Sequence, residues 1–550
     1  RDLRMSRGLG DVYKRQISNE FGGNFKDSTC HCEKCQKKFR EWLKNKYGTL
    51  DKLNASWWTG FWSHKYTDWD QIHSPSPQGE CLTTALTLDW KRFSSEQITD
   101  FCKMEADALR EFSDLPTTTN MMGFFKGVDY NTLKNAVDII SWDNYPFWHE
   151  RKDEVPEAVY TSAGNALMRS LKREPFLLME STPSSVSWRS HNPLKRPGMH
   201  MLSSMQAVAH GADSVQYFQW RKSRGGYEKF HGAVVDHKNG SDTRTFREVT
   251  EVGKRLEHLS GGIKTFLNRA KAAIVFDWEN WWAVEDTSGP RQDLDYVKCV
   301  TDHYRAFWEC GLDVDFVSMD DDFSGYRLLA APLNYMYKKG YSEKVRAFVE
   351  AGGTYVTTYF SGIVNETDLC FIGRHPLEDV LGVVSEEMDA PSKEFENCFD
   401  YNGKEYPAYT MCDIVHAKAK TEIYSVYKKD FYKGCPVVTE NAYGSGRAYY
   451  LSAESDQRFL SAFYKDVFIK AGLLKEASSA DRILKRLPHG VTAAKREDET
   501  GRKGLVFVMN FNDRQVRLEG IGKQIDAESG EVYENVLEMA PFSCTILKLK

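Results

Sequence analysis

The sequence lacks the features that mark several large classes of protein. No run approaches the ~18–20 consecutive apolar residues of a membrane-spanning helix. Positive charge is not in excess: 73 Lys and Arg face 78 Asp and Glu, for a net charge of -5, which argues against a nucleic-acid-binding face. Twelve cysteines in 550 residues are too sparse for a secreted disulfide scaffold, so reduced thiols and a cytoplasmic location are favoured.

Internal repeats and low-complexity linkers are also missing, and the first residues, RDLRMSRGLGDVYKRQ, contain no apolar core of signal-peptide type.

The chain is long and rich in aromatic side chains. Because 550 residues exceed what one hydrophobic core can hold, two to four domains are expected. Aromatic residues make up 13% of the chain, with 14 Trp and 27 Tyr. Such rings suit stacking on the apolar faces of sugars, although large cores and interfaces use them too.

Short apolar runs alternate with helical segments over roughly the first half of the chain. This alternation predicts a parallel sheet whose strands are connected by helices. The predicted strands span residues 116–125, 136–146, 174–182 and 211–220, and the predicted helices span Glu96–Phe112, Val155–Arg169, Met199–His210 and Thr243–Leu259.

Polar residues lie near the ends of these four strands, namely Asn120, Asp143, Glu180 and Gln219, and Glu20 lies where a fifth short strand is expected to end. In a β/α barrel, side chains at the carboxyl ends of the strands face the active site. Two carboxylates facing each other across a sugar can cleave a glycosidic bond, one as proton donor and the other as nucleophile. A single such glutamate is more often a surface or salt-bridge residue, but two of them on one sheet favour the catalytic interpretation.

Two further blocks follow the first one. Residues 266–478 contain predicted strands at 271–278, 312–318 and 326–336 and a helix, turn and strand at 343–362, which predict an α/β domain of flavodoxin or amidotransferase type. Amidotransferase activity is rejected because the stretch TTYFSG (357–362) lacks the nucleophilic cysteine. Residues 479–550 contain short alternating strands at 504–512, 514–520 and 540–550, which predict a small antiparallel β domain.

Several long motifs carry a resemblance to a known family. ISNEFGG (17–23) is followed by CHCEKCQKKFREWLKNKYGTLDKLNASWWTGFWSHKYTDWDQI (30–72), and SWDNYP (141–146), LLMESTPSSVSWRSHNPLKRPG (177–198) and QYFQWRKSRGGYEKFHGAVV (216–235) come later. Together they resemble glycoside hydrolase family 42, the β-galactosidases. The resemblance implies a (β/α)8 barrel whose fourth strand ends in Asn-Glu and whose seventh ends in Glu, with a middle domain through which family members form trimers.

The resemblance also implies a role for individual residues. Glu20 would be the acid/base and Glu180 the nucleophile, with Asn19 on the sugar 2-hydroxyl. The remaining pocket residues would be Tyr145 beside Glu180, Trp188 stacked on the galactose, Phe218 at the pocket floor, and Glu228 and His231 on sugar hydroxyls. The implied reaction is retaining hydrolysis of terminal β-D-galactosides through a galactosyl-enzyme, without a catalytic cofactor. α-L-Arabinopyranosides share the ring stereochemistry and are a second candidate substrate.

Cys30, Cys32 and Cys35 form the only dense cysteine cluster in the sequence. Thiolates at this spacing can converge on one zinc ion, which prefers tetrahedral sulfur ligands. The family resemblance implies a four-cysteine structural zinc whose remaining ligand lies earlier in the chain, yet no cysteine precedes Cys30. We therefore expect a structural site that lacks one ligand, and a metal-free cluster of reduced thiols is the alternative.

Little chain precedes Glu20. A βα unit needs roughly 30 residues, and only 19 come before Glu20, although the family places its acid/base after the fourth strand. We therefore expect residues 1–15 to be foreign to the fold and residues 16–265 to form a barrel with strands four to eight, carrying the cysteine cluster and a Trp-rich insertion. An inactive chain that only binds or assembles, and a secretion signal on a longer natural chain, are open alternatives.

Overall fold

The computed structural model describes residues 15–23, 29–75, 83–263, 266–474 and 487–549. Nearly all of the leader expected at residues 1–15 therefore lies outside the described residues. Its last residue, Arg15, is described and pairs with Thr117 in the first strand of a sheet. Within the described ranges, no helix has both the length and the apolar character needed to cross a membrane.

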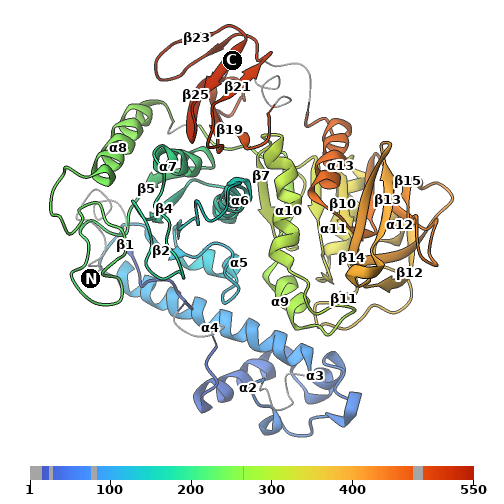
Figure 1. Ribbon diagram of the computed structural model, residues 1–550. Coiled ribbons are helices and arrows are strands. Elements are labelled where there is room, and N and C mark those ends of the chain that lie inside the picture. The colour runs from blue at the N-terminus through green and yellow to red at the C-terminus, as the bar shows by residue number, and fades with distance from the viewer. Residues whose placement is uncertain (1–14, 24–28, 76–82, 264–265, 475–486, 550) are drawn as a thin grey trace.

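The first sheet has five parallel strands that lie side by side in chain order. The strands are β1 (Arg15–Gln16), β2 (Thr117–Met121), β3 (Ile139–Asp143), β4 (Phe176–Glu180) and β5 (Ala212–Val215). The associated helices are α4 (Thr84–Arg110), α5 (Tyr130–Leu133), η5 (Lys134–Ala136), α6 (Val155–Lys172), α7 (Met199–Ala209) and α8 (Arg244–Ile263). The predicted alternation of strands and helices in a parallel sheet is confirmed, and the carboxyl ends of the five strands meet along one edge of the sheet (Figure 1).

The ends of two strands differ from the prediction. β3 ends at Asp143 and β4 at Glu180, as predicted, but β1 ends at Gln16 and β5 at Val215. Glu20 and Gln219 thus lie in the loops that follow their strands. After β1 the backbone turns at Glu20, whose φ of 46° is left-handed and ends the extended conformation. The helix predicted from Glu96 begins earlier, at Thr84, because the first half of α4 packs against the insertion.

The insertion between β1 and β2 forms a helical lobe at one end of α4 (Figure 1). It contains α2 (Glu33–Tyr47), α3 (Leu50–Ser56), η2 (Phe61–Ser63) and η3 (Trp69–Gln71). Its own core includes Phe39, Leu43, Leu53, Trp57 and, from α4, Trp90. Because α2 begins directly after the cysteine cluster, this core fixes where the cluster stands relative to the first sheet.

The middle block is built on a seven-stranded mixed sheet in the order β15-β16-β17-β10-β8-β6-β7. Its strands are β15 (Glu422–Val426), β16 (Pro436–Tyr443), β17 (Gly446–Leu451), β10 (Thr354–Thr358), β8 (Leu328–Ala331), β6 (Ala272–Val275) and β7 (Val314–Val317). Its helices are α9 (Trp278–Asp286), α10 (Tyr296–Glu309), α11 (Tyr341–Glu350), α12 (Glu378–Leu381) and α13 (Gln457–Lys470). The predicted α/β architecture is confirmed.

A four-stranded sheet within this block was not predicted. It consists of β12 (Val383–Asp389), β14 (Lys404–Ala417), β13 (Asn397–Tyr401) and β18 (Ala453–Glu454), with η6 (Lys393–Phe395) between β12 and β13. β9 (Met336–Tyr337) and β11 (Val364–Asn365) form a separate pair. The prediction stopped at the strand and turn near residue 362 and therefore missed this β-rich stretch.

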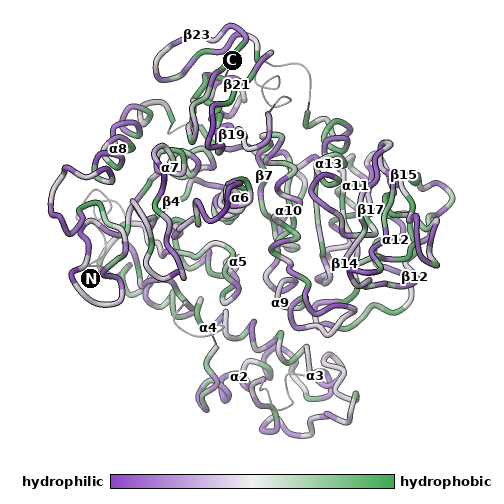
Figure 2. The backbone as a smooth tube through the Cα atoms, viewed as in Figure 1, coloured by the Kyte–Doolittle hydropathy of each residue, from purple (hydrophilic) through white to green (hydrophobic). Residues whose placement is uncertain are grey.

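The last block is antiparallel, as predicted. β19 (Val491–Glu497), β20 (Gly504–Asn510) and β25 (Ser543–Leu549) form a three-stranded sheet, while β21 (Val516–Glu519) pairs with β24 (Val536–Met539) and β22 (Gln524–Ile525) with β23 (Val532–Tyr533). The three-stranded sheet contacts α7 of the first block. Figure 2 shows the hydrophobic residues concentrated along the strands of the sheets, with hydrophilic segments on the outer loops.

Helix α6 lies between the first sheet and the middle block, where it contacts β3 on one side and β7 and α10 on the other. Its residues from Thr161 to Leu171 are all buried. Gly164 is required at the contact with β3, since a Cβ there would stand 2.7 Å from a ring carbon of Trp142. On the other side the buried Arg169 donates hydrogen bonds to the Val314 carbonyl at 2.6 Å and to Asp315 at 2.9 Å.

Candidate active site

Three carboxyl groups meet at the carboxyl edge of the first sheet. Glu20 comes from the loop after β1, Asp143 from the end of β3 and Glu180 from the end of β4. One carboxylate oxygen from each residue lies within 4.8 Å of one from each of the others. The two glutamates are partly exposed, whereas Asp143 is buried. The sequence thus predicted both glutamates, and the structure brings them together with a third acid.

Side-chain hydrogen bonds orient Glu180. The Tyr145 hydroxyl donates to Oε2 at 2.7 Å, and Asn120 Nδ2 donates to Oε1 at 3.4 Å. The pKa of Tyr145 is raised well above its ordinary value, first by burial and then by the negative charge of Glu180. The phenol therefore keeps its proton at neutral pH and remains available to donate it to the carboxylate.

Glu20 is held by the turn in which it lies. Its backbone N–H donates to Asn120 Oδ1 at 3.1 Å, and Asn19 Nδ2 donates to its Oε2 at 3.4 Å. The N–H of Gly23 donates to the Glu20 carbonyl at 2.9 Å, which closes the turn. These contacts direct the Glu20 side chain towards β3 and β4 rather than away from the sheet edge.

Asn120 connects the groups of the site, and sequence reasoning gave it no role beyond that of a strand end. It lies in β2 and is 1% exposed. Its amide nitrogen donates to Asp143 at 2.6 Å and to Asn19 at 2.9 Å, while its amide oxygen accepts from Gln16 at 3.1 Å. The one sequence signal for this role is the position of Asn120 near the end of a predicted strand of the same sheet.

An aromatic wall stands next to Glu180. The Tyr145 ring contacts Trp188 edge-on with centroids 4.9 Å apart, and Trp188 lies 5.1 Å from the ring of His231. Phe218, which is buried, contacts His231 edge-on at 5.0 Å. Trp188 is 41% exposed, so its ring is accessible to a ligand. The structure thus brings four of the predicted pocket residues together beside the nucleophile candidate.

His231 and Glu228 lie on the same loop after β5. His231 is buried, its Nε2 lies 3.1 Å from the Phe218 carbonyl, and burial lowers the pKa of His231 to about 4. The imidazole is therefore neutral at neutral pH. Glu228 is half-buried, and its carbonyl accepts the His231 backbone N–H at 2.9 Å. Its carboxylate makes no hydrogen bond to the other predicted residues within the described part of the chain.

A cavity of about 490 Å³ adjoins Glu20. Its lining includes Asn19, Glu20, Cys30, Cys35 and Phe101. It extends from the catalytic edge of the sheet to the cysteine cluster. A cavity of about 620 Å³ on the middle block, lined by residues such as Asp320 and Phe348, contains none of the predicted site residues.

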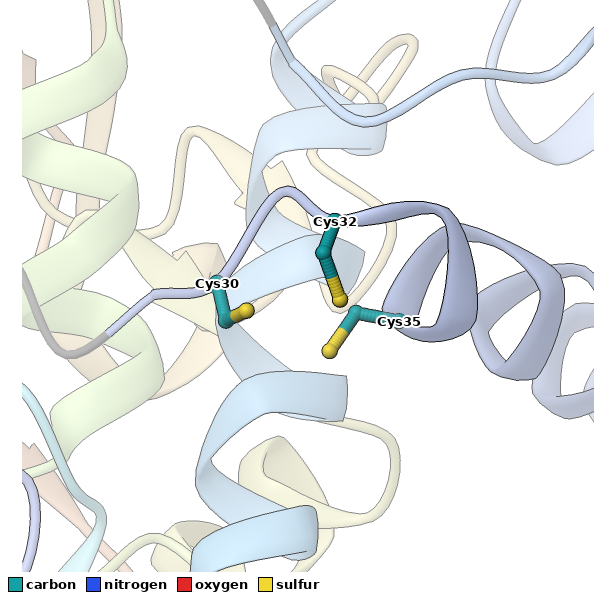
Figure 3. Close-up of side chains that lie close together, drawn as sticks. All are labelled: Cys30, Cys32 and Cys35. Atoms are coloured by element: carbon teal, nitrogen blue, oxygen red, sulfur yellow. The ribbon is translucent and has the colours of Figure 1, made fainter.

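The three cysteines converge as predicted. The sulfur atoms of Cys30, Cys32 and Cys35 lie within 4.8 Å of one another, and Figure 3 shows them pointing towards a common space at the start of α2. The Cys35 backbone N–H, followed by hydrogen bonds from the neighbouring thiols, lowers the pKa of Cys32 to about 7. Burial raises the pKa of Cys35 to about 12. Convergent thiols of which one ionises near neutral pH fit a zinc ion.

His31 does not complete this cluster. Its ring stacks on Trp90 with centroids 5.2 Å apart, and its Nε2 lies 3.3 Å from the Thr29 hydroxyl. Among the described residues, the group of potential metal ligands at this position contains the three cysteines alone.

Family models match most of the chain. Residues 8–259 match the model described as beta-galactosidase of glycoside hydrolase family 42, and residues 270–474 match the beta-galactosidase trimerisation domain. The beta-galactosidase BglY of Alicyclobacillus acidocaldarius is 47% identical over 510 residues, covering 90% of this chain and 71% of that protein. The chain belongs to glycoside hydrolase family 42. It is therefore a hydrolase, as the motifs predicted.

Other members of family 42 agree with this assignment. The beta-galactosidase Pbg of Clostridium perfringens is 43% identical over 552 residues, covering 97% of this chain and 78% of that protein. A crystal structure of a beta-galactosidase from a Rahnella species is 46% identical, with a TM-score of 0.90 over 97% of this chain and 77% of that one. Gan42B, a GH42 beta-galactosidase from G. stearothermophilus, also gives a TM-score of 0.90 at 41% identity, over 97% of this chain and 78% of that one. These structures confirm a barrel-type catalytic domain followed by further domains.

Proposed function

We propose that this family 42 enzyme hydrolyses terminal β-D-galactosides with retention of configuration. The observation that carries the proposal is the short separation of the Glu20 and Glu180 carboxylates, with oxygens within 4.8 Å of one another. Retaining glycosidases hold their two carboxyl groups about 5–5.5 Å apart, whereas inverting enzymes leave about 6.5–9.5 Å for a water molecule. The preference for galactose is supported by the names of BglY and Pbg, both of which are beta-galactosidases.

In the first step Glu180 attacks the anomeric carbon while Glu20 protonates the departing glycosidic oxygen. The Tyr145 hydroxyl supports the nucleophile by holding one carboxylate oxygen at 2.7 Å and leaving the other to attack. In the second step Glu20, now a carboxylate, removes a proton from water, and the water displaces Glu180 from the galactosyl-enzyme. The sugar is held against Trp188 by stacking, and its hydroxyls form hydrogen bonds with Asn19, Glu228 and His231, with Phe218 behind His231.

Azide rescue tests the two roles separately. In Glu180→Gly, azide can enter from the face opposite the leaving group, and the product should be an α-galactosyl azide. In Glu20→Ala, an activated aryl galactoside should still form the galactosyl-enzyme without protonation, and azide should then yield the β-galactosyl azide. Glu251→Ala, on the exposed face of α8, is the matched control and should behave as wild type. Exchanged product configurations would mean that the roles are reversed, and unchanged hydrolysis in both variants would reject the site.

We also propose that Cys30, Cys32 and Cys35 hold a structural zinc ion. When bound, zinc would cross-link the loop that follows Glu20 to the start of α2, and it would take no part in the two-carboxylate chemistry. Removal of the ion should therefore lower stability before it changes the rate constant of an already folded enzyme. A zinc titration with a chromogenic chelator tests the site, and Cys35→Ser should weaken the binding that it measures.

The protein's oligomeric state and cellular location can also be inferred. We infer a homotrimer formed through the middle block, supported by its match to a trimerisation domain. Sedimentation equilibrium would test this state. We also infer a cytoplasmic location, supported by the thiols of the described cysteines, all of which are free. Fractionation of cells that produce the protein would test the location.

A further inference from the structure

Asp143 is an acid at the centre of the site that the two-carboxylate mechanism does not use. It ends β3, between the strands that lead to Glu20 and Glu180, and it is 7% exposed. One of its oxygens lies within 4.8 Å of oxygens from both glutamates. A buried acid in this position must affect the protonation of its neighbours, because three negative charges at this spacing repel one another strongly.

The contacts of Asp143 distinguish its two oxygens. Oδ2 accepts a hydrogen bond from Asn120 Nδ2 at 2.6 Å. Oδ1 is fully buried, and within the described residues no donor reaches it. An ionised carboxylate accepts hydrogen bonds but cannot donate them. Ionised Asp143 would thus keep a buried oxygen without a donor among these residues, next to a second carboxylate.

Burial and charge both favour the neutral acid. The pKa of Asp143 is raised well above its ordinary value, first by burial, then by the negative charges of Glu180 and Glu20, and further by a hydrogen bond with the Glu20 side chain. The hydrogen bond from Asn120 acts in the opposite direction. Among the described residues, Tyr145 and Tyr130 also sense the charge of Asp143, and burial keeps both phenols protonated. Neither phenol offsets the charge of an ionised Asp143.

We propose that Asp143 is a positioning residue that keeps its proton throughout the reaction and donates it as a hydrogen bond to Glu20 whenever Glu20 is a carboxylate. This rests on the proposed roles of Glu20 and Glu180. The proton stays on Asp143 at each step. In the first step the proton that reaches the glycosidic oxygen comes from Glu20, and in the second step Glu20 recovers a proton from water.

The consequence is that Glu20 is held in place when it is the charged base of the second step. After the first step Glu20 and Asp143 would repel each other if both were ionised, and Glu20 could turn away from the anomeric carbon. A neutral Asp143 replaces this repulsion with a hydrogen bond. The aspartate thereby acts through Glu20 on the second step of the reaction, in which water must be deprotonated.

Two substitutions separate this role from a merely structural one. Asp143→Asn imitates the neutral acid, because its amide can still donate to Glu20 and accept from Asn120, whereas Asp143→Ala removes both contacts. Asp107→Asn, on the exposed side of α4, is the matched control. We expect the turnover of a dinitrophenyl galactoside, whose second step limits the rate, to fall less than about tenfold in the Asn variant and on the order of 10²-fold in the Ala variant. The proposal would be overturned if the Asn and Ala variants turned over at equal rates, whether both rates were close to wild type or both were strongly reduced.

Infrared spectroscopy tests the proton directly and does not depend on turnover. The difference spectrum between wild type and Asp143→Asn at pH 7 should contain the carbonyl stretch of a neutral carboxyl group, and the Asp107→Asn difference should contain carboxylate bands instead. Carboxylate bands alone in the Asp143 spectrum would overturn the proposal. Failure of the proposed function would look different, because Glu20→Ala and Glu180→Gly would then keep their activity whatever the infrared spectrum shows.

Discussion

The hydrogen bond from Tyr145 to Glu180 offers a quantitative test of the site. Tyr145→Phe removes one hydroxyl that donates to Oε2 at 2.7 Å. The ring should stay in place, since it packs edge-on against Trp188 and His231 at 4.9 Å and 5.7 Å. The contact from Asn120, at 3.4 Å, is too long to replace this bond.

A hydrogen bond to a charged group contributes about 1.5–3 kcal/mol. At about 1.36 kcal/mol per factor of ten, Tyr145→Phe should lower kcat/KM for an aryl β-galactoside by roughly 10- to 150-fold. Tyr160→Phe makes the same change at a half-exposed position on α6 and should leave kcat/KM unaltered. If both variants stay within about twofold of wild type, the hydroxyl does not orient the nucleophile, and Glu180 must be held in some other way.

Three further outcomes are expected. Gly164→Ala should lower the free energy of unfolding by about 1–3 kcal/mol, because its new methyl would stand 2.7 Å from a buried ring. Gly253→Ala, which has no atom within 4 Å of the new methyl, should instead raise the free energy of unfolding by about 0.5–1 kcal/mol. Equal effects of the two substitutions in urea unfolding would contradict this. Iodoacetamide at pH 7 should modify Cys32 before Cys35, because the pKa of Cys32 is about 7 and that of Cys35 is about 12. Peptide mass spectrometry can show this order, and zinc should protect both thiols. Burial lowers the pKa of His303 to about 3 from 6.5, so the unfolded chain binds the proton more tightly than the folded one. Stability should therefore fall as the pH drops from about 6.5 towards 3, and His303→Gln should flatten that dependence in urea unfolding.

The sequence predicted which acids meet at the edge of the first sheet, because their signals are local. Asp143 and Glu180 each follow a buried apolar run directly, so the end of the run marks the end of the strand. Glu20 was identified by its motif, although it lies beyond β1, because a left-handed turn separates it from the strand. The role of Asn120 could not be predicted, since it depends on side chains from several strands meeting at one point.

The missed strands of the middle block have a different explanation. β12 is exposed at five successive residues from Val384 to Met388, so it lacks the alternation that indicates a half-buried strand. β14 contains Pro407, which argues against a strand in the sequence, yet the structure pairs it with Cys398 near one end of a long antiparallel ladder. Burial in these strands is set by partners distant in the chain, and a pattern read along the sequence does not contain that information.

The burial of α6 has a consequence for how the protein unfolds. One helix supplies core contacts to both the catalytic sheet and the middle block, and Arg169 bridges them through Val314 and Asp315. Separating the two blocks would take two acceptors away from a buried guanidinium and leave it the His210 carbonyl at 3.3 Å, which is costly. The catalytic sheet and the middle block should therefore melt in a single cooperative transition, and limited proteolysis should not release the catalytic sheet as a stable fragment. An enzyme of this design cannot be shortened to its catalytic domain without replacing the surface that α6 now covers.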